Sequence, residues 1–296
     1  MGCKGSQQKI GEGYVQAEEA KLYYKSIGEG EPVIIVHGGP GLSHNYLLPH
    51  LKNLSKIFQL IFYDQRGSGL SEANVDSESI TVNEFVKDID LIRTHFGFEK
   101  IHIMGHSWGG YLAMKYAITN PNNVRSLLLV SSNGKTEESL KDYDRIRAIR
   151  MTSEDTKQMS EIFASEEFKV AEVNTIENLV RMFFKPVLYD SLNINYINFG
   201  INEYTAKNLF KIFGLLSNNR KGYDLTEQLK YLSIPTLIIH GNDDPLLPKY
   251  ALLLHETISG SELVMMEKCG HFPFVEQQDK FTIAVTDFLL KLDSKR

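Results

Sequence analysis

Short runs of mainly aliphatic residues recur along the chain, each bounded by glycine, proline or polar residues. They lie at residues 32–38, 58–64, 100–106, 124–132 and 235–241. Runs this short and rich in Val, Ile and Leu predict strands that are buried on both faces. A weaker run and an alternating pattern predict one further strand and an edge strand, at 262–267 and 20–28.

Helical periodicity separates these runs. Residues 81–97 place an apolar stripe on one side of a helix that ends at Gly97, and the stripe consists of Phe85, Ile89, Ile92 and Phe96. The last helix carries a similar stripe of Phe281, Val285, Phe288 and Leu292. Strands that alternate with helices predict an α/β fold, with a mostly parallel central sheet and helices on both of its faces.

The alternation stops between residues 134 and 232, where helical patterns continue without a convincing strand. We therefore expect a helical cap over 134–232, inserted between two strands of a core formed by 13–133 and 233–296. Residues 1–12 are polar and glycine-containing, which predicts a flexible tail.

Charge and composition exclude several classes of partner. The net charge of −5 and the pI of about 6.0 leave no basic surplus, so we expect no nucleic-acid partner. No apolar run reaches the roughly 18 to 20 residues of a transmembrane helix. The two cysteines are Cys3 and Cys269, and because Cys3 falls in the expected tail we expect no structural disulfide.

The N-terminal sequence MGCKGS allows three interpretations. Gly2 after Met1, with Ser6 at the required spacing, fits N-myristoylation, and Cys3 fits palmitoylation. A second interpretation is a lipoprotein with its lipid on Cys3, and the third is a plain disordered tail. The sequence thus predicts a cytoplasmic protein, or one held at a membrane by a lipid on Gly2 or Cys3.

The sequence GHSWG at 105–109 supplies a candidate nucleophile. Ser107 stands between a predicted strand and a predicted helix, with Gly105 and Gly109 on either side. Such a turn holds its serine in a strained conformation at the carboxyl end of the strand, and larger flanking residues would collide with neighbouring backbone. The alternative is an ordinary strand-to-helix turn.

A serine hydroxyl needs a base, and a carboxylate must fix the tautomer of that base. His271 follows the last predicted strand in a loop, whereas the other histidines lie in buried strands or on segments without a partner pattern. Asp243 and Asp244, directly after the strand at 235–241, compete for the carboxylate role. The spacing from the preceding glycine favours Asp244.

An oxyanion needs two backbone donors. HGGPG at 37–41 follows the first central strand, and its adjacent glycines let N–H groups approach a substrate oxygen closely. We assign Gly39 as the donor, with Gly38 as the alternative. The N–H of Trp108, at the start of the helix after Ser107, is the second donor.

Together these motifs resemble the α/β-hydrolase superfamily and, within it, the proline iminopeptidase family. The resemblance extends over nearly the whole chain, and its motifs occur in the family's order: HGGPG, YDQRGSGLS, GHSWGG, GNDDPLLP and CGHFPFVEQ. It implies the α/β-hydrolase fold and a triad in the chain order Ser107, Asp244, His271. It further implies release of an N-terminal residue, typically proline, from short peptides. Asp64 and Arg66, in the second motif, are expected to brace the site rather than react.

The resemblance also implies a carboxylate that binds the free amino group of the substrate. Some members carry Asn-Glu-aromatic-Thr in the cap, and NEYT at 202–205 matches it, which makes Glu203 the candidate. The alternative for Glu203 is a solvated carboxylate at a helix start. Some relatives have a second glutamate after the catalytic aspartate, where this chain has Pro245. One anchor is therefore missing, or another acid of the cap replaces it.

Three functions stay open at this point. The first is an aminopeptidase for short peptides. The second is an esterase, lipase or amidase with the same mechanism, which the missing glutamate and the aromatic residues of 181–199 favour. The third is a small-molecule receptor on the same fold. No cluster of His, Cys and Asp has ligand spacing and no dinucleotide fingerprint is present, so we expect no metal and no cofactor.

Overall fold

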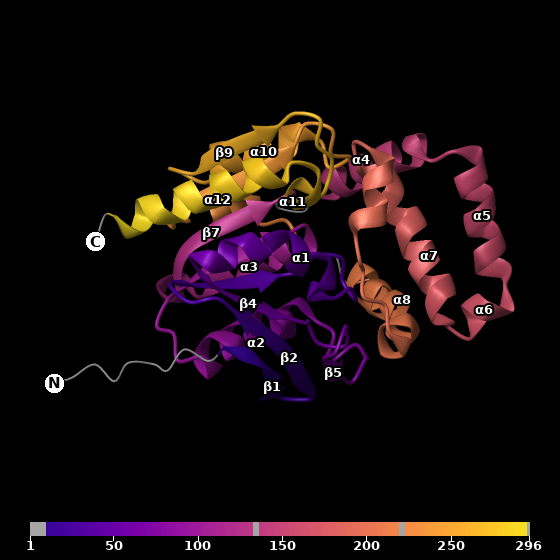
Figure 1. Ribbon diagram of the computed structural model, residues 1–296, viewed down its shortest axis with the longest axis horizontal. Helices are drawn as coiled ribbons and strands as arrows, with labels where there is room; N and C mark the ends of the chain where they lie inside the picture. The colour runs from indigo at the N-terminus through magenta and orange to yellow at the C-terminus, as the bar shows by residue number, and fades with distance from the viewer. Residues whose placement is uncertain (1–9, 133–135, 219–222, 295–296) are drawn as a thin grey trace.

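The computed structural model describes residues 10–132, 136–218 and 223–294, so Gly2 and Cys3, the predicted lipid sites, lie outside the described residues. Within the described part, nine strands form one sheet in the order β1-β2-β4-β3-β6-β7-β8-β9, with β5 paired to β2 (Figure 1). The strands are β1 (Gly11–Ala17), β2 (Ala20–Ile27), β3 (Pro32–Val36), β4 (Gln59–Tyr63), β5 (Glu72–Ala73), β6 (Ile101–His106), β7 (Val124–Val130), β8 (Thr236–Gly241) and β9 (Glu262–Met266).

The strands from β4 to β9 along this order run parallel, and β2 runs antiparallel to β4, β1 and β5. This arrangement confirms the predicted mostly parallel sheet. The predicted strands appear as β2, β3, β4, β6, β7, β8 and β9. Strand β1 was not predicted and begins at Gly11, inside the segment expected to be a tail. Only Val15 of β1 is buried, because β1 lies at the edge of the sheet, so no apolar run marks it.

Helices cover both faces of the sheet. On one face, α2 (Val82–His95), α3 (Trp108–Thr119) and α10 (Pro248–Thr257) pack on alternate strand residues such as Ile34 and Ile103. On the other face, α1 (Leu48–Leu51) and α12 (Gln278–Asp293) pack on the intervening residues such as Ile35 and Met104. Both predicted helix stripes face these cores. The central parallel strands β3, β4, β6, β7 and β8 therefore bury both of their faces, which is why these strands are continuously apolar. The edge strand β9 is only partly buried, which fits its weaker apolar run.

Local signals start and stop these helices. The Thr81 hydroxyl accepts a hydrogen bond from the Glu84 N–H at the start of α2. Gly97, with φ of +73°, ends the helix in a conformation that other residues rarely adopt. Sequence and structure agree on both ends of this helix.

A group of helices stands beside the sheet rather than against either face (Figure 1). It consists of α4 (Glu137–Arg150), α5 (Ser153–Ala164), α6 (Glu166–Lys169), α7 (Val173–Phe184) and α8 (Glu203–Asn218). We call this group the cap helices. The short helix α9 (Thr226–Leu229), within the range predicted for the cap, instead packs through Leu229 into the core that holds α2 and α3. The exact boundaries of core and cap stay a prediction.

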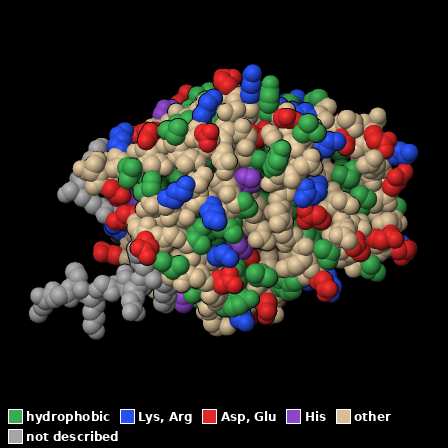
Figure 2. All heavy atoms as spheres, in the orientation of Figure 1, with side chains coloured by type: hydrophobic (Ala, Val, Ile, Leu, Met, Phe, Trp, Pro, Cys, Tyr) green, Lys and Arg blue, Asp and Glu red, His purple; other side chains and the backbone are tan. Residues whose placement is uncertain are grey.

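The surface mixes charges of both signs, and acidic side chains gather at the end occupied by α5 and α6 (Figure 2). None of the helices in the described part of the chain has the length and apolar character needed to cross a membrane. Cys269 is buried with its thiol free, and burial raises the pKa of that thiol well above its usual value.

Candidate active site

Ser107 occupies a tight turn between β6 and α3. Its backbone has φ of +53° and ψ of −115°, a strained conformation for a residue with a side chain. A β-carbon on Gly105 would lie 2.3 Å from the Gly109 carbonyl oxygen, and one on Gly109 would lie 2.1 Å from that of Val36. Only glycine fits at these two positions, which is the steric reason expected from the sequence.

His271 and Asp244 meet at the carboxyl ends of the strands. The Nδ1 atom of His271 lies 3.0 and 2.8 Å from the two carboxylate oxygens of Asp244, and both side chains are buried. Oδ1 of Asp244 also accepts from the Leu246 N–H at 2.8 Å. Burial alone would raise the pKa of Asp244, but the charge and hydrogen bond of His271 outweigh it and hold this pKa below its usual value. Asp243, the competing acid, is partly exposed and engages Cys269 only through its backbone N–H.

Ser107 and His271 line the same cavity, which has a volume of about 150 Å³. Gly39 and Trp108 line it as well, so four of the predicted site residues surround one space. The walls also include Phe183, Phe184 and Phe213 from the cap helices and one carboxylate among the described lining residues, Asp144 of α4. A substrate at Ser107 would therefore lie between the sheet and the cap.

The loop after β3 presents one of its two candidate glycines to the cavity. The Gly38 N–H donates to the Tyr46 hydroxyl at 2.5 Å and is therefore engaged. Gly39 lines the cavity with φ of +50°. A β-carbon there would meet Leu42 at 2.5 Å, which explains the glycine. Of the two candidate glycines, Gly39 therefore lines the cavity, whereas the N–H of Gly38 is occupied by Tyr46.

A hydrogen-bonded chain that was not predicted joins this loop to His271. The Tyr46 hydroxyl donates to His106 Nδ1 at 2.8 Å, and His106 Nε2 donates to the His271 carbonyl at 2.8 Å. This pattern requires neutral His106. Burial, followed by the nearby charge of His271, lowers the pKa of His106 to about 3, which keeps the ring neutral. The only sequence signal for this hydrogen-bonded chain is the presence of aromatic and histidine residues in the motifs.

Gln65 makes a second connection that was not predicted. Its amide accepts from the Trp108 indole N–H at 3.0 Å and donates to the His37 carbonyl at 2.6 Å. Its backbone N–H donates to His37 Nε2 at 3.0 Å. Gln65 thus fixes the start of α3 and the loop after β3 relative to each other, which sets the spacing of the two expected oxyanion donors.

Asp64 and Arg66, the sequence neighbours of Gln65, hold the surrounding loops and helix α2 in place. Asp64 accepts from the backbone N–H groups of His44 and Leu70, both at 2.8 Å. Arg66 is buried and forms a bidentate pair with Asp88, with both contacts at 2.7 Å. Neither side chain lines the cavity that holds Ser107.

Comparison with known proteins decides the family. Residues 31–278 match the family described as alpha/beta hydrolase fold. A proline iminopeptidase from Heyndrickxia coagulans is 30% identical, covering 94% of this chain and 98% of its own. One from Saccharolobus solfataricus is 30% identical, covering 97% and 94%. This chain belongs to the proline iminopeptidase family of α/β hydrolases. Among solved structures, a hydrolase from Pseudomonas aeruginosa aligns with a TM-score of 0.70 at 18% identity, covering 94% of this chain and 98% of that one.

In this member of the proline iminopeptidase family, the NEYT segment holds the start of α8 against the loop at Gly69 and does not line the cavity. Asn202 accepts from the Thr205 N–H and donates to the Gly69 carbonyl, both at 2.8 Å. Glu203, between them, is exposed at the first turn of α8 and is absent from the described residues that line the cavity. The structure therefore does not bring Glu203 together with Ser107. Pro245, beside Asp244, is buried and offers no charge.

Glu276, which was not predicted, supports the loop that carries His271. Its carboxylate accepts from the backbone N–H groups of Tyr189 at 2.7 Å, Gly270 at 3.0 Å and Phe272 at 3.3 Å. Burial raises the pKa of Glu276 to about 7, against the opposing effect of these donors. This carboxylate therefore titrates near neutral pH in the folded protein.

The raised pKa of Glu276 predicts a pH-dependent stability. The folded chain holds this proton to higher pH than the unfolded chain, so the free energy of unfolding falls as pH rises from 4.5 through about 7. A glutamine at position 276 cannot titrate. Over that pH interval the free energy of unfolding of wild type should therefore fall by roughly 1 to 3 kcal/mol more than that of Glu276→Gln. Urea unfolding at several pH values measures the difference. Asp279→Asn, at an exposed acid of α12, is the control, and parallel curves for Glu276→Gln and wild type would contradict the assignment.

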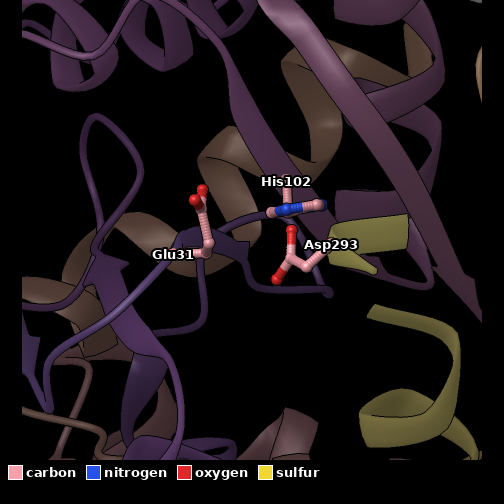
Figure 3. A group of neighbouring side chains, drawn as sticks. All are labelled: Glu31, His102 and Asp293. Carbon is pink, nitrogen blue, oxygen red and sulfur yellow. The ribbon is translucent and has the colours of Figure 1, made fainter. Parts of the chain in front are cut away.

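A group of polar side chains lies at the opposite end of the sheet. Glu31, His102 and Asp293 offer ligand atoms within 4.8 Å of one another, a set that suits a cation (Figure 3). However, Glu31 pairs with Arg125, and His102 Nδ1 contacts the Ser126 hydroxyl at 2.6 Å. These contacts tie together the amino ends of β3, β6 and β7. Ser107 follows the carboxyl end of β6, so this group is not placed to take part in chemistry at Ser107.

Proposed function

We propose that this protein is a serine hydrolase that releases an N-terminal residue, typically proline, from short peptides. The observation that carries the proposal is that His271, paired with the buried Asp244, lines the same cavity as Ser107. The curated relatives named proline iminopeptidase, which match nearly the whole chain, support the choice of substrate.

The proposed mechanism follows from these positions. Ser107 attacks the carbonyl carbon of the first peptide bond while His271 Nε2 takes the hydroxyl proton. Asp244 fixes the proton on Nδ1 and stabilises the imidazolium that forms. The N–H groups of Gly39 and Trp108 stabilise the oxyanion. His271 then protonates the leaving amine, and a water activated by the same imidazole hydrolyses the acyl-enzyme.

An aminopeptidase must also bind the free amino group of its substrate. We assign this role to Asp144, because it is the carboxylate that lines the cavity with Ser107 among the described residues. Its position on α4 fits the expectation that another acid of the cap replaces a missing glutamate. The competing candidate is Glu203, which would have to enter the cavity by a movement of α8.

Two matched substitutions separate these candidates. We expect Asp144→Asn to lower kcat/KM for prolyl-naphthylamide about ten- to a hundredfold, because a charge-assisted hydrogen bond to the ammonium is lost. Hydrolysis of a short nitrophenyl ester, which has no ammonium, should change far less. Glu203→Gln is the parallel variant. A selective loss in Glu203→Gln but not in Asp144→Asn would move the amine site to Glu203, and equal losses on both substrates would remove the role from either residue.

The main alternative is an esterase or amidase with an uncharged acyl pocket. The aromatic walls of the cavity, Phe183, Phe184 and Phe213, favour it. Activity profiling over aminoacyl naphthylamides and nitrophenyl esters tests the two functions directly. A kcat/KM for prolyl-naphthylamide well above that for the corresponding amide without a free amine supports the aminopeptidase, and hydrolysis of esters alone supports the alternative.

A further inference from the structure

A second cavity of about 330 Å³ lies among the cap helices. We call it the cap chamber. Its walls are almost entirely apolar and include Met159, Phe163, Leu179 and Phe210. Phe183, Phe184 and Phe213 line both the chamber and the cavity at Ser107, as do Gly39, Pro40 and Leu42. The two cavities are therefore adjacent, and a ligand whose reacting carbonyl lies at Ser107 would reach the chamber by passing these aromatic side chains.

Arg147 of α4 brings a positive charge into the wall of this chamber. Its guanidinium lies 3.9 Å from the centre of the Phe183 ring, which fixes its plane. Nη1 makes only a weak contact, 3.9 Å from the Met151 sulfur, and Nε is buried without a hydrogen-bond partner. Within the described residues, no carboxylate forms an ion pair with Arg147.

The charged side chains described around Arg147 do not neutralise it. Lys185, a second cation of this region, is already paired with Asp155 at 2.9 Å. Asp144 precedes Arg147 by three residues on α4 but lines the other cavity and forms no ion pair with it among the described side chains. A guanidinium with unused donors in an apolar wall is costly unless an anion satisfies it. The planar donor pair of arginine suits a carboxylate in particular.

We propose that the cap chamber binds the apolar residue after the scissile bond and that Arg147 holds the substrate's C-terminal carboxylate. This rests on the proposed aminopeptidase function and narrows the substrate to very short peptides with a free C-terminus. Asp144 and Arg147 begin about 5 to 6 Å apart, as side chains one turn apart on a helix do. An extended dipeptide separates its amino and carboxylate groups by about 7 Å. One helix thus offers complementary charges to both ends of a dipeptide.

Paired substrates test this assignment. We expect wild type to hydrolyse Pro-Leu with kcat/KM about ten- to a hundredfold above that for Pro-Leu amide, mainly through KM, because only the acid can pair with Arg147. Arg147→Gln should bring the ratio of acid to amide close to one, and Arg147→Lys should restore part of it. Lys185→Gln, which removes a different cation of the same region, should keep the wild-type ratio. Thermal melting of each variant checks folding.

Two outcomes overturn the proposal: equal kcat/KM for acid and amide in wild type, or an unchanged ratio in Arg147→Gln. If no prolyl compound is hydrolysed, the aminopeptidase function fails, and binding then tests the chamber by itself. Calorimetry with Ser107→Ala should show octanoate binding at least tenfold more tightly than octanamide, and a further Arg147→Gln change should remove the difference. Equal binding of the two compounds to Ser107→Ala would overturn the carboxylate site independently of any peptide activity.

Discussion

Replacing Ser107 with alanine is expected to lower turnover of prolyl-naphthylamide and of nitrophenyl esters by about a thousandfold or more, as in other triads. The loss should fall on kcat for both substrates, because the covalent step disappears while the cavity walls stay in place. Ser107→Ala keeps the backbone strain at φ of +53°, because alanine also carries a β-carbon, so stability should change little. Steady-state kinetics and thermal melting measure the two effects.

A fluorophosphonate probe separates this role from that of a receptor. Wild type should be labelled, Ser107→Ala should not, and Ser132→Ala should stay labelled. Ser132 is the matched control because it lines the same cavity, but its hydroxyl donates to the Val130 carbonyl at 2.9 Å. Absence of labelling in folded wild type would favour a ligand receptor, and labelling that persists in Ser107→Ala would place the nucleophile elsewhere.

The sequence was most informative where structure follows from local pattern. Continuous apolar runs identified the central strands because those strands bury both faces, as Ile34 and Ile35 do against opposite cores. The glycines beside Ser107 identified the turn because any β-carbon there meets backbone. Strand β1 carries neither signal, because its pairing with β2 is through backbone and most of its side chains are exposed.

Contacts between distant segments were beyond the reach of the sequence. Tyr46, Gln65 and Glu276 each support the site through at least one distant partner, up to 87 residues away for Glu276, and no spacing rule connects these pairs. The cap was harder still. Motif matching selected Glu203. Both acids are exposed, but the orientation of α4 and α8 places only Asp144 of the two on the wall of the cavity. Helix orientation depends on packing over the whole cap, which periodicity does not encode.

Asp244→Asn is expected to lower kcat about a thousand- to ten-thousandfold. Oδ1 of Asp244 accepts from the Leu246 N–H, and both oxygens lie within 3.0 Å of His271 Nδ1. An asparagine must turn its NH₂ toward one of these two donors. Either the loop loses its hydrogen bond or His271 adopts the wrong tautomer and can no longer take the proton of Ser107.

Asp243→Asn is the matched control, because it removes the adjacent charge from the same turn without touching His271. Stability adds a second readout. The pKa of Asp244 is held below its usual value, so this carboxylate stabilises the fold above the unfolded-state pKa, and that contribution is lost as pH falls through the lower folded-state pKa. Wild type should therefore be more stable than Asp244→Asn at neutral pH, with the gap closing in acid. A kinetic loss in Asp243→Asn comparable to that in Asp244→Asn would show that the turn, rather than one carboxylate, sustains catalysis.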